Sequence, residues 1–179
     1  ICCKDISRGI KSLSWKSHLM DLAHHQEQSK VRRKENGRFF KRLKKVAPKV
    51  LDSLIHPLHD EVFECTNCLE CANCCKTTGP LFTDKDINRI AKHLSSKPSE
   101  FTEKYLQLDE DRDYVLKSVP CPFLAEDNSC SIYTFRPKAC REFPHTDRIK
   151  QYQLLHLTQK NVEVCPAVFT IVEKLKAEF

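Results

Sequence analysis

The stretch CTNCLECANCC, residues 65–75, is the most distinctive part of the sequence. Its cysteines are separated by two residues at a time until the last two, which are adjacent: Cys65, Cys68, Cys71, Cys74 and Cys75. Two intervening residues let the chain fold round a metal so that both flanking thiolates point inward. One such pair can arise by chance, but this succession of cysteines indicates a metal centre that organises the fold.

Further cysteines follow at wider spacing: Cys121, Cys130, Cys140 and Cys165. Cys121 and Cys165 each precede a proline, which stiffens the backbone beside the thiol. Together with the first stretch these thiols exceed the four ligands of one tetrahedral site, so the sequence predicts two sites or one polynuclear centre. Because adjacent side chains point in different directions, we expect Cys74 and Cys75 to serve different sites, or one of them to pack in the core.

Zinc and iron–sulfur both suit such a cluster. Zinc sites usually draw two ligands from one Cys-x2-Cys pair and two from a distant pair. An iron–sulfur cubane instead accepts three thiolates at this consecutive spacing, with a remote fourth ligand in a Cys-Pro pair. Cys68, Cys71 and Cys74 match that layout, with either Cys165-Pro166 or Cys121-Pro122 as the remote pair. The pattern favours an iron–sulfur cluster of the 4Fe–4S type and leaves zinc open, and the centre is either structural or chemically active.

Length and composition describe a globular chain with an unusual number of thiols. The chain has 179 residues, 40% hydrophobic and 30% charged, which suits one domain with an extension. Its eleven cysteines are an odd number and cannot all pair, and no export signal is apparent. We therefore expect reduced thiols and a cytoplasmic location. No stretch approaches the roughly 18 apolar residues of a membrane span, and three glycines leave no phosphate-binding loop.

The start of the chain suggests a division into segments. The sequence opens with Ile1, and its only methionine is Met20. We expect residues 1–19 to be translated upstream sequence or disordered, which leaves Cys2 and Cys3 outside the metal site. Residues 20–63 are then a basic helical extension and residues 64–179 the metal-binding domain.

The extension carries most of the positive charge. Residues 30–49 contain ten basic residues against the single acid Glu35: Lys30, Arg32, Arg33, Lys34, Arg38, Lys41, Arg42, Lys44, Lys45 and Lys49. Such a segment can bind an acidic protein or phosphates. Long basic side chains also commonly just solvate a helix face, which we favour. Nothing beyond charge indicates nucleic-acid binding, which stays open as an alternative.

Hydrophobic periodicity predicts a mainly α fold with short strands or loops. We expect a helix that opens near Pro48 and is kinked or divided at Pro57, with these apolar positions: Leu51, Leu54, Ile55, Leu58 and Val62. His56 and His59 flank that proline, and we expect both to face solvent rather than to bind metal.

Later signals predict further elements. Thr83 is a typical N-cap, and Pro98 can open a second short helix. Residues 109–113 read as an acidic turn and 114–119 as a short strand. A last helix is predicted from residues spaced along one face: Val168, Ile171, Val172, Leu175 and Phe179.

The motifs resemble one known family. Three segments carry the resemblance: Cys68-x2-Cys71-x2-Cys74-Cys75, then Cys121-Pro122-Phe123-Leu124, then Cys130-Ser131-Ile132-Tyr133-x2-Arg136-Pro137-x2-Cys140-Arg141-x-Phe143-Pro144. Over about residues 60–175 the chain resembles the bacterial YkgJ-like CxxCxxCC family, described as zinc- or iron-chelating and as iron–sulfur-cluster-containing.

The resemblance implies a ligand set: Cys68, Cys71, Cys74, Cys75, Cys121, Cys130, Cys140 and Cys165. Cys65 lies outside the family motif and is an additional candidate ligand. Some longer relatives are flagellin lysine methylases that use S-adenosylmethionine. This chain lacks the length for their extra region.

Tyr133, Arg136 and Arg141 flank the third segment of the motif. The two arginines could hydrogen-bond sulfurs, bind an anionic substrate or form an ion pair with Asp84 or Asp86. We expect Tyr133 to pack around the site.

Three functions are consistent with these features. The first is an iron–sulfur or zinc protein in electron transfer, metal handling or assembly. The second is an enzyme resembling an S-adenosylmethionine-dependent protein lysine methyltransferase. The third is a zinc-stapled adaptor whose basic segment docks on nucleic acid or an acidic protein. No catalytic grouping stands out, so whether the chain is an enzyme stays open.

Overall fold

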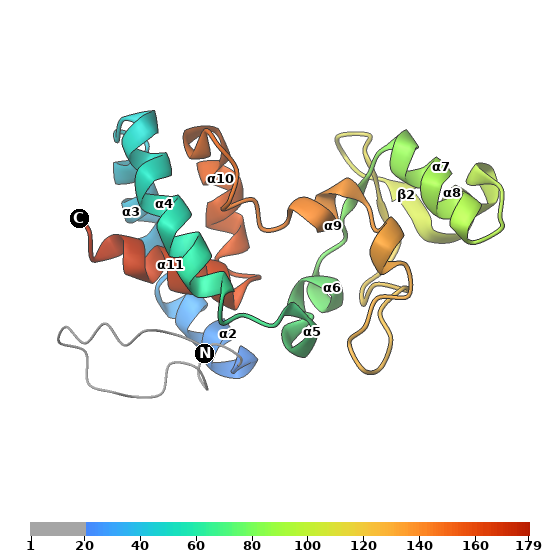
Figure 1. The fold of residues 1–179 in the computed structure, drawn as a ribbon, viewed down its shortest axis with the longest axis horizontal. Coiled ribbons are helices and arrows are strands. Elements are labelled where there is room, and N and C mark those ends of the chain that lie inside the picture. Colours follow the sequence, from blue (N-terminus) through green and yellow to red (C-terminus); the bar gives the residue numbers. More distant parts are fainter. Residues whose placement is uncertain (1–20) are drawn as a thin grey trace. The chain divides into compact units, whose positions relative to one another are not determined.

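A computed structural model describes residues 21–179, so the predictions for residues 1–19 lie outside the described residues. The contacts divide the chain into two compact units, which we describe separately. Unit 1 contains residues up to Cys71 together with Pro144–Phe179, and unit 2 is the continuous segment Ala72–Phe143. Figure 1 colours the chain along its sequence and labels many of the elements of both units.

Unit 1 is helical throughout its described part. Its helices are α2 (Leu22–Val31), α3 (Arg33–Leu43), α4 (Pro48–Phe63), α5 (Cys68–Cys71), α10 (Gln151–Asn161) and α11 (Pro166–Lys176). Helix α4 packs against α10 and α11, which follow it by about a hundred residues in the chain. The core joins apolar side chains of α3, α4, α10 and α11, among them Phe40, Leu51, Leu155 and Val172. The helices predicted as an N-terminal extension thus pack with the last two helices. Whether residues 64–179 fold without residues 20–63 stays a prediction.

Unit 2 combines short helices with a small sheet. Its elements are α6 (Asn73–Thr77), β1 (Leu81–Phe82), α7 (Asp84–His93), α8 (Pro98–Tyr105), β2 (Leu106–Leu108), β3 (Tyr114–Leu116), the 3-10 helix η1 (Tyr133–Phe135) and α9 (Lys138–Glu142). The strand order is β1-β3-β2 with antiparallel pairing, and Val115 lies opposite both Leu81 and Gln107. Phe101 is buried at the centre of the core and stacks on Phe123 with ring centroids 6.1 Å apart.

The mainly α fold with short strands is confirmed. Thr83 caps α7 as predicted, Pro98 begins α8, and β3 begins at Tyr114. Helix α4 continues through Pro57 as one element, so the proline does not divide it, and the alternative of a kink stays a prediction. No helix in the described part of the chain is both long and apolar enough to cross a membrane.

Candidate metal centre

Three free thiols belong to unit 1. Cys68 and Cys71 lie on α5, and Cys165 is the N-cap of α11. Cys165 packs beside Val62, near the C-terminal end of α4, from which the chain runs directly into α5. The structure therefore brings the remote thiol of Cys165 near the first two cysteines of the family motif, whose charges act on it.

Burial dominates the acidity of Cys165. Burial, with a smaller contribution from the charges of Cys71 and Cys68, raises the pKa of this thiol to about 12. The backbone N–H groups of Val168 and Ala167, in the first turn of α11, oppose this shift because they stabilise the thiolate. Without a bound cation, this thiol is therefore neutral at physiological pH.

Cys65 differs from the other described cysteines because it is disulfide-bonded. A metal ligand must be a thiolate, so the Cys65 sulfur cannot bind a metal in this form. Its assignment as an additional ligand stays a prediction.

The free thiols of unit 2 come from three separate segments. Cys74 and Cys75 lie on α6, which follows the left-handed residue Ala72 (φ 47°) and so does not continue α5. The remaining three lie in the loop after β3 and on α9: Cys121, Cys130 and Cys140. The charges of Cys75 and both loop cysteines act on Cys140, so the fold makes neighbours of thiols up to 65 positions apart in sequence.

The pKa values of these thiols move in opposite directions. A hydrogen bond with the Cys74 thiol lowers the pKa of Cys75 to about 7, although burial opposes this. Burial raises the pKa of Cys121 and Cys130 and takes that of Cys140 to about 12. Unit 2 thus holds one thiol that ionises readily beside three that ionise reluctantly.

The described residues include eight free thiols. Thiolates are the ligands preferred by zinc and iron–sulfur clusters, so the donor chemistry fits these metals. Among residues 21–179, however, no three His, Cys, Asp or Glu side chains are drawn together closely enough to hold a metal ion. The thiols are neighbours in each unit, and binding would require their side chains to turn toward a common point.

Comparison with known families assigns this cysteine pattern. A family model described as "CxxCxxCC: Putative zinc- or iron-chelating domain" matches residues 67–166, which is more than half of the chain. The chain belongs to the CxxCxxCC family. All eight free cysteines among residues 21–179 fall within the matched segment, whereas Cys65 precedes it. No solved structure shows a significant match to the chain.

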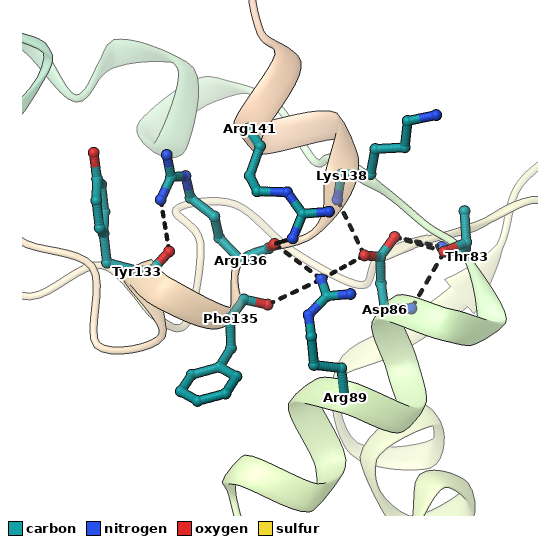
Figure 2. A network of polar contacts seen from close by, with 8 residues as sticks. All are labelled: Thr83, Asp86, Arg89, Tyr133, Phe135, Arg136, Lys138 and Arg141. Carbon is teal, nitrogen blue, oxygen red and sulfur yellow. Dashed lines mark hydrogen bonds and ion pairs between the residues drawn. The ribbon is translucent and has the colours of Figure 1, made fainter.

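A buried carboxylate anchors the CxxCxxCC segment that carries Cys140 (Figure 2). Asp86 is 1% exposed, and its Oδ2 accepts hydrogen bonds from the N–H (3.1 Å) and hydroxyl (2.7 Å) of Thr83. Its Oδ1 accepts from the Arg89 guanidinium (2.6 Å) and from the Lys138 N–H (3.1 Å). Because Lys138 is the first residue of α9, Asp86 ties α7 to the helix of Cys140.

Arg89 reinforces this connection. Its guanidinium also donates to the backbone carbonyls of Phe135 (3.3 Å) and Arg136 (3.1 Å). The ring of Phe135 stacks on His93, with centroids 4.0 Å apart. Helix α7 therefore holds both the turn before α9 and the first residue of α9.

Asp86 forms its ion pair with Arg89, which corrects the prediction that Arg136 or Arg141 is its cation. Arg136 lies over the Tyr133 ring at 3.8 Å from the centroid and donates to the Tyr133 carbonyl (2.7 Å). Its charge favours the thiolates of Cys130 and Cys140. Arg141 donates to the Arg136 carbonyl (3.2 Å). Figure 2 shows these side chains in one view with Asp86 and Arg89.

The two histidines of α4 are half-buried, so the prediction that they face solvent is wrong. His59 Nδ1 lies 2.8 Å from the Thr146 hydroxyl, and the ring stacks on Phe63 with centroids 4.4 Å apart. His56 Nε2 lies 2.9 Å from the Arg148 carbonyl oxygen. These contacts support structural roles for both rings.

Several basic residues of segment 30–49 make contacts within unit 1. Arg33 forms a two-point ion pair with Glu163, with N–O distances of 2.8 and 2.6 Å, and Arg32 pairs with Glu173. These contacts show that part of the positive charge serves packing between helices. Binding of an acidic protein or nucleic acid by this segment stays a prediction.

Proposed function

We propose that this chain is a metal-binding protein whose unit 1 thiolates hold an iron–sulfur cluster for electron transfer or metal handling. The observation that carries the proposal is the proximity of Cys165 to Cys68 and Cys71. Cys68 and Cys71 supply two thiolates at Cys-x2-Cys spacing and Cys165 supplies a Cys-Pro thiolate, which are parts of a common cluster-binding pattern. Of the two Cys-Pro pairs in the sequence, Cys165-Pro166 shares a unit with Cys68 and Cys71, which supports its choice over Cys121-Pro122.

The residues around Cys165 suit this role. Pro166 begins α11 and fixes the backbone beside the thiol, while Leu58 and Phe63 pack against the same small core as Cys165. Apolar cover limits access of water to a bound group, and the N-terminus of α11 favours a thiolate. An iron–sulfur cluster bound there supplies reversible one-electron chemistry.

The enzyme and adaptor alternatives stay predictions. The family description concerns metal binding. The methyltransferase hypothesis therefore rests only on the resemblance to longer relatives.

The test is anaerobic purification of the full chain, with iron, zinc and acid-labile sulfide analysis beside a visible spectrum. We expect iron with matching sulfide and visible absorption, both lost in Cys165→Ser. Thr170→Ser is the matched control because it changes a side chain of the same helix and leaves every thiol intact. Zinc without sulfide would contradict the cluster while preserving metal binding. A chain without metal would contradict both.

A further inference from the structure

Helix α3 places its basic and buried residues on opposite faces. The buried face consists of one polar and three apolar residues: Asn36, Phe39, Phe40 and Leu43. Arg38 and Lys41 follow Lys34 by four and seven positions, so these three exposed residues lie along the other face. We call Lys34, Arg38 and Lys41 the basic stripe. Lys44 and Lys45 are also exposed and extend the positive charge into the turn that follows the helix.

The acids near the basic stripe are paired with other cations. Glu163 and Glu173 form ion pairs with Arg33 and Arg32, respectively. Glu35 is the only acid of segment 30–49, and it pairs with a lysine of α11 at 2.5 Å. Among residues 21–179, no carboxylate forms an ion pair with the basic stripe. Its three charges are therefore available to a partner.

Stability of the helix does not explain the basic stripe. Lys34 is the second residue of α3, where a positive charge opposes the helix dipole. Arg38 lies four positions after Lys34 and three before Lys41, and like charges at these spacings repel each other on a helix. A bound polyanion compensates these charges, whereas solvation of the helix face leaves the repulsion in place.

The surface around the basic stripe lacks the apolar side chains of a protein interface. Among residues 32–49 no large hydrophobic side chain is exposed, and the nearest ones are Val31 and Val50. The centre of a protein–protein interface is apolar and depleted in lysine. Stacking on single-stranded bases likewise needs exposed aromatic rings. The surface therefore favours contact with phosphates, which needs basic side chains alone.

The length of the charged surface suits an extended row of phosphates. Lys44 follows Lys34 by ten positions, which is about 15 Å along a helix at a rise of roughly 1.5 Å per residue. Duplex DNA carries one phosphate charge per roughly 1.7 Å of its axis, or about nine over this length. A single phosphate group cannot contact both ends of such a surface, whereas a duplex offers phosphates along all of it.

We infer that the basic stripe, together with Lys44 and Lys45, binds the phosphate backbone of duplex nucleic acid without regard to base sequence. This inference goes beyond the proposed function and does not depend on a bound metal. Each phosphate contact releases condensed counterions from the duplex, so the affinity falls steeply as the salt concentration rises.

The test measures fluorescence anisotropy of a labelled mixed-sequence DNA duplex, titrated with the full chain purified without oxygen. The salt concentration is varied between about 50 and 200 mM NaCl. We expect the triple variant Lys34→Gln/Arg38→Gln/Lys41→Gln to have a shallower plot of log affinity against log salt. The slope should decrease in magnitude by about 2.7, because each phosphate contact contributes about 0.9. Across this salt range the wild type should therefore lose about 40-fold more affinity than the variant.

A second triple variant provides the matched control. Lys85→Gln/Lys92→Gln/Lys160→Gln removes the same net charge from exposed positions outside segment 30–49. It should keep the slope of the wild type, since its lysines lie on other helices.

Protection from chemical modification tests the same surface without any variant. An N-hydroxysuccinimide ester of acetic acid acetylates exposed lysines of the wild type, and mass spectrometry assigns each modified position. The duplex should slow acetylation of Lys34 and Lys41 and leave Lys85 and Lys92 unchanged. This measurement is independent of any folding defect in the variants.

Four outcomes would overturn the inference. The first is no binding of the duplex at the lowest salt concentration, and the second is an equal change of slope in the two triple variants. Equal affinity for poly-glutamate would indicate an acidic protein as the partner. Tighter binding to vesicles that contain phosphatidylserine than to the duplex would indicate a membrane surface.

Discussion

Asp86→Asn removes the charge from the carboxylate that ties α7 to α9, while it keeps the size of the side chain. The carboxylate accepts four hydrogen bonds, two on each oxygen. An asparagine keeps one oxygen and places an NH2 group where the other oxygen was. At least two of the four donors therefore lose their acceptor, and Arg89 loses its counter-ion.

The cost can be worked from these contacts. Hydrogen bonds to a charged group contribute roughly 1.5–3 kcal/mol each. Breaking a buried ion pair by removing one partner costs about 3–5 kcal/mol. We therefore expect the free energy of unfolding to fall by about 3–5 kcal/mol, which is a large part of the roughly 5–15 kcal/mol that stabilises a typical domain.

The assay is urea unfolding at pH 7, followed by circular dichroism, for wild type, Asp86→Asn and Asp84→Asn. Asp84 is the matched control because it occupies the same first turn of α7 but is exposed. Removal of the Asp84 charge should lower the free energy of unfolding by no more than about 1 kcal/mol, which is the contribution of a charge at a helix N-terminus. Equal decreases in the free energy of unfolding of Asp86→Asn and Asp84→Asn would refute the role assigned to the buried carboxylate.

The pH dependence gives an independent check. Burial raises the pKa of Asp86, but hydrogen bonds from Thr83, Arg89 and the Lys138 N–H outweigh it, so the pKa lies below its ordinary value. The stability that Asp86 contributes is therefore present above about pH 3.9, the ordinary value. It is lost as the pH falls through the lower pKa of the folded state. The difference in free energy of unfolding between wild type and Asp86→Asn should therefore decrease in acid. A difference that stays constant from pH 7 to pH 3 would contradict this.

Three further predictions concern other parts of the chain. Phe101→Ala should lower the free energy of unfolding by roughly 3–5 kcal/mol in urea titrations, because Phe101 is 1% exposed. Burial lowers the pKa of His25, whose Nε2 lies 2.9 Å from the Val162 carbonyl oxygen. Wild type should therefore lose stability as the pH falls below about 6.5 and through the lowered pKa, and His25→Gln should lack this step in urea titrations between pH 7 and pH 5. Cys71→Ser should lose more metal, by elemental analysis, than Cys65→Ser, and equal losses would make Cys65 a ligand.

Local signals in the sequence were sufficient to predict most helices and a cysteine cluster of the metal-chelating type. Thr83 and Pro98 mark helix starts because a cap and a helix-opening proline act within a few residues. The Cys-x2-Cys spacing likewise indicates metal binding, and it can be recognised without knowledge of the fold. The strand predicted at 114–119 is present from Tyr114 to Leu116, since a short run of aromatic, β-branched and apolar residues is a local strand signal.

The errors involve contacts between distant parts of the chain. His59 was expected to face solvent, but it meets Thr146, which lies 87 positions later. Asp86 has the spacing of a capping residue relative to Thr83, yet its bond to Lys138 spans 52 positions. The pair with Arg89, by contrast, is local, because Asp86 and Arg89 are three residues apart on one helix. The spacing could not decide which Cys-Pro pair lies beside Cys68 and Cys71, because tertiary packing determines it.

The interruption of unit 1 by the continuous unit 2 has a consequence for the order of events during synthesis. Cys68 and Cys71 leave the ribosome well before Cys165, which is 94 positions after Cys71. At about 5–20 residues per second, they wait roughly 5–20 seconds for this partner. Every thiol of unit 2 is translated within that interval. The continuous unit 2 is therefore fully translated first, while the thiols of Cys68 and Cys71 remain open to oxidation until the last helix emerges.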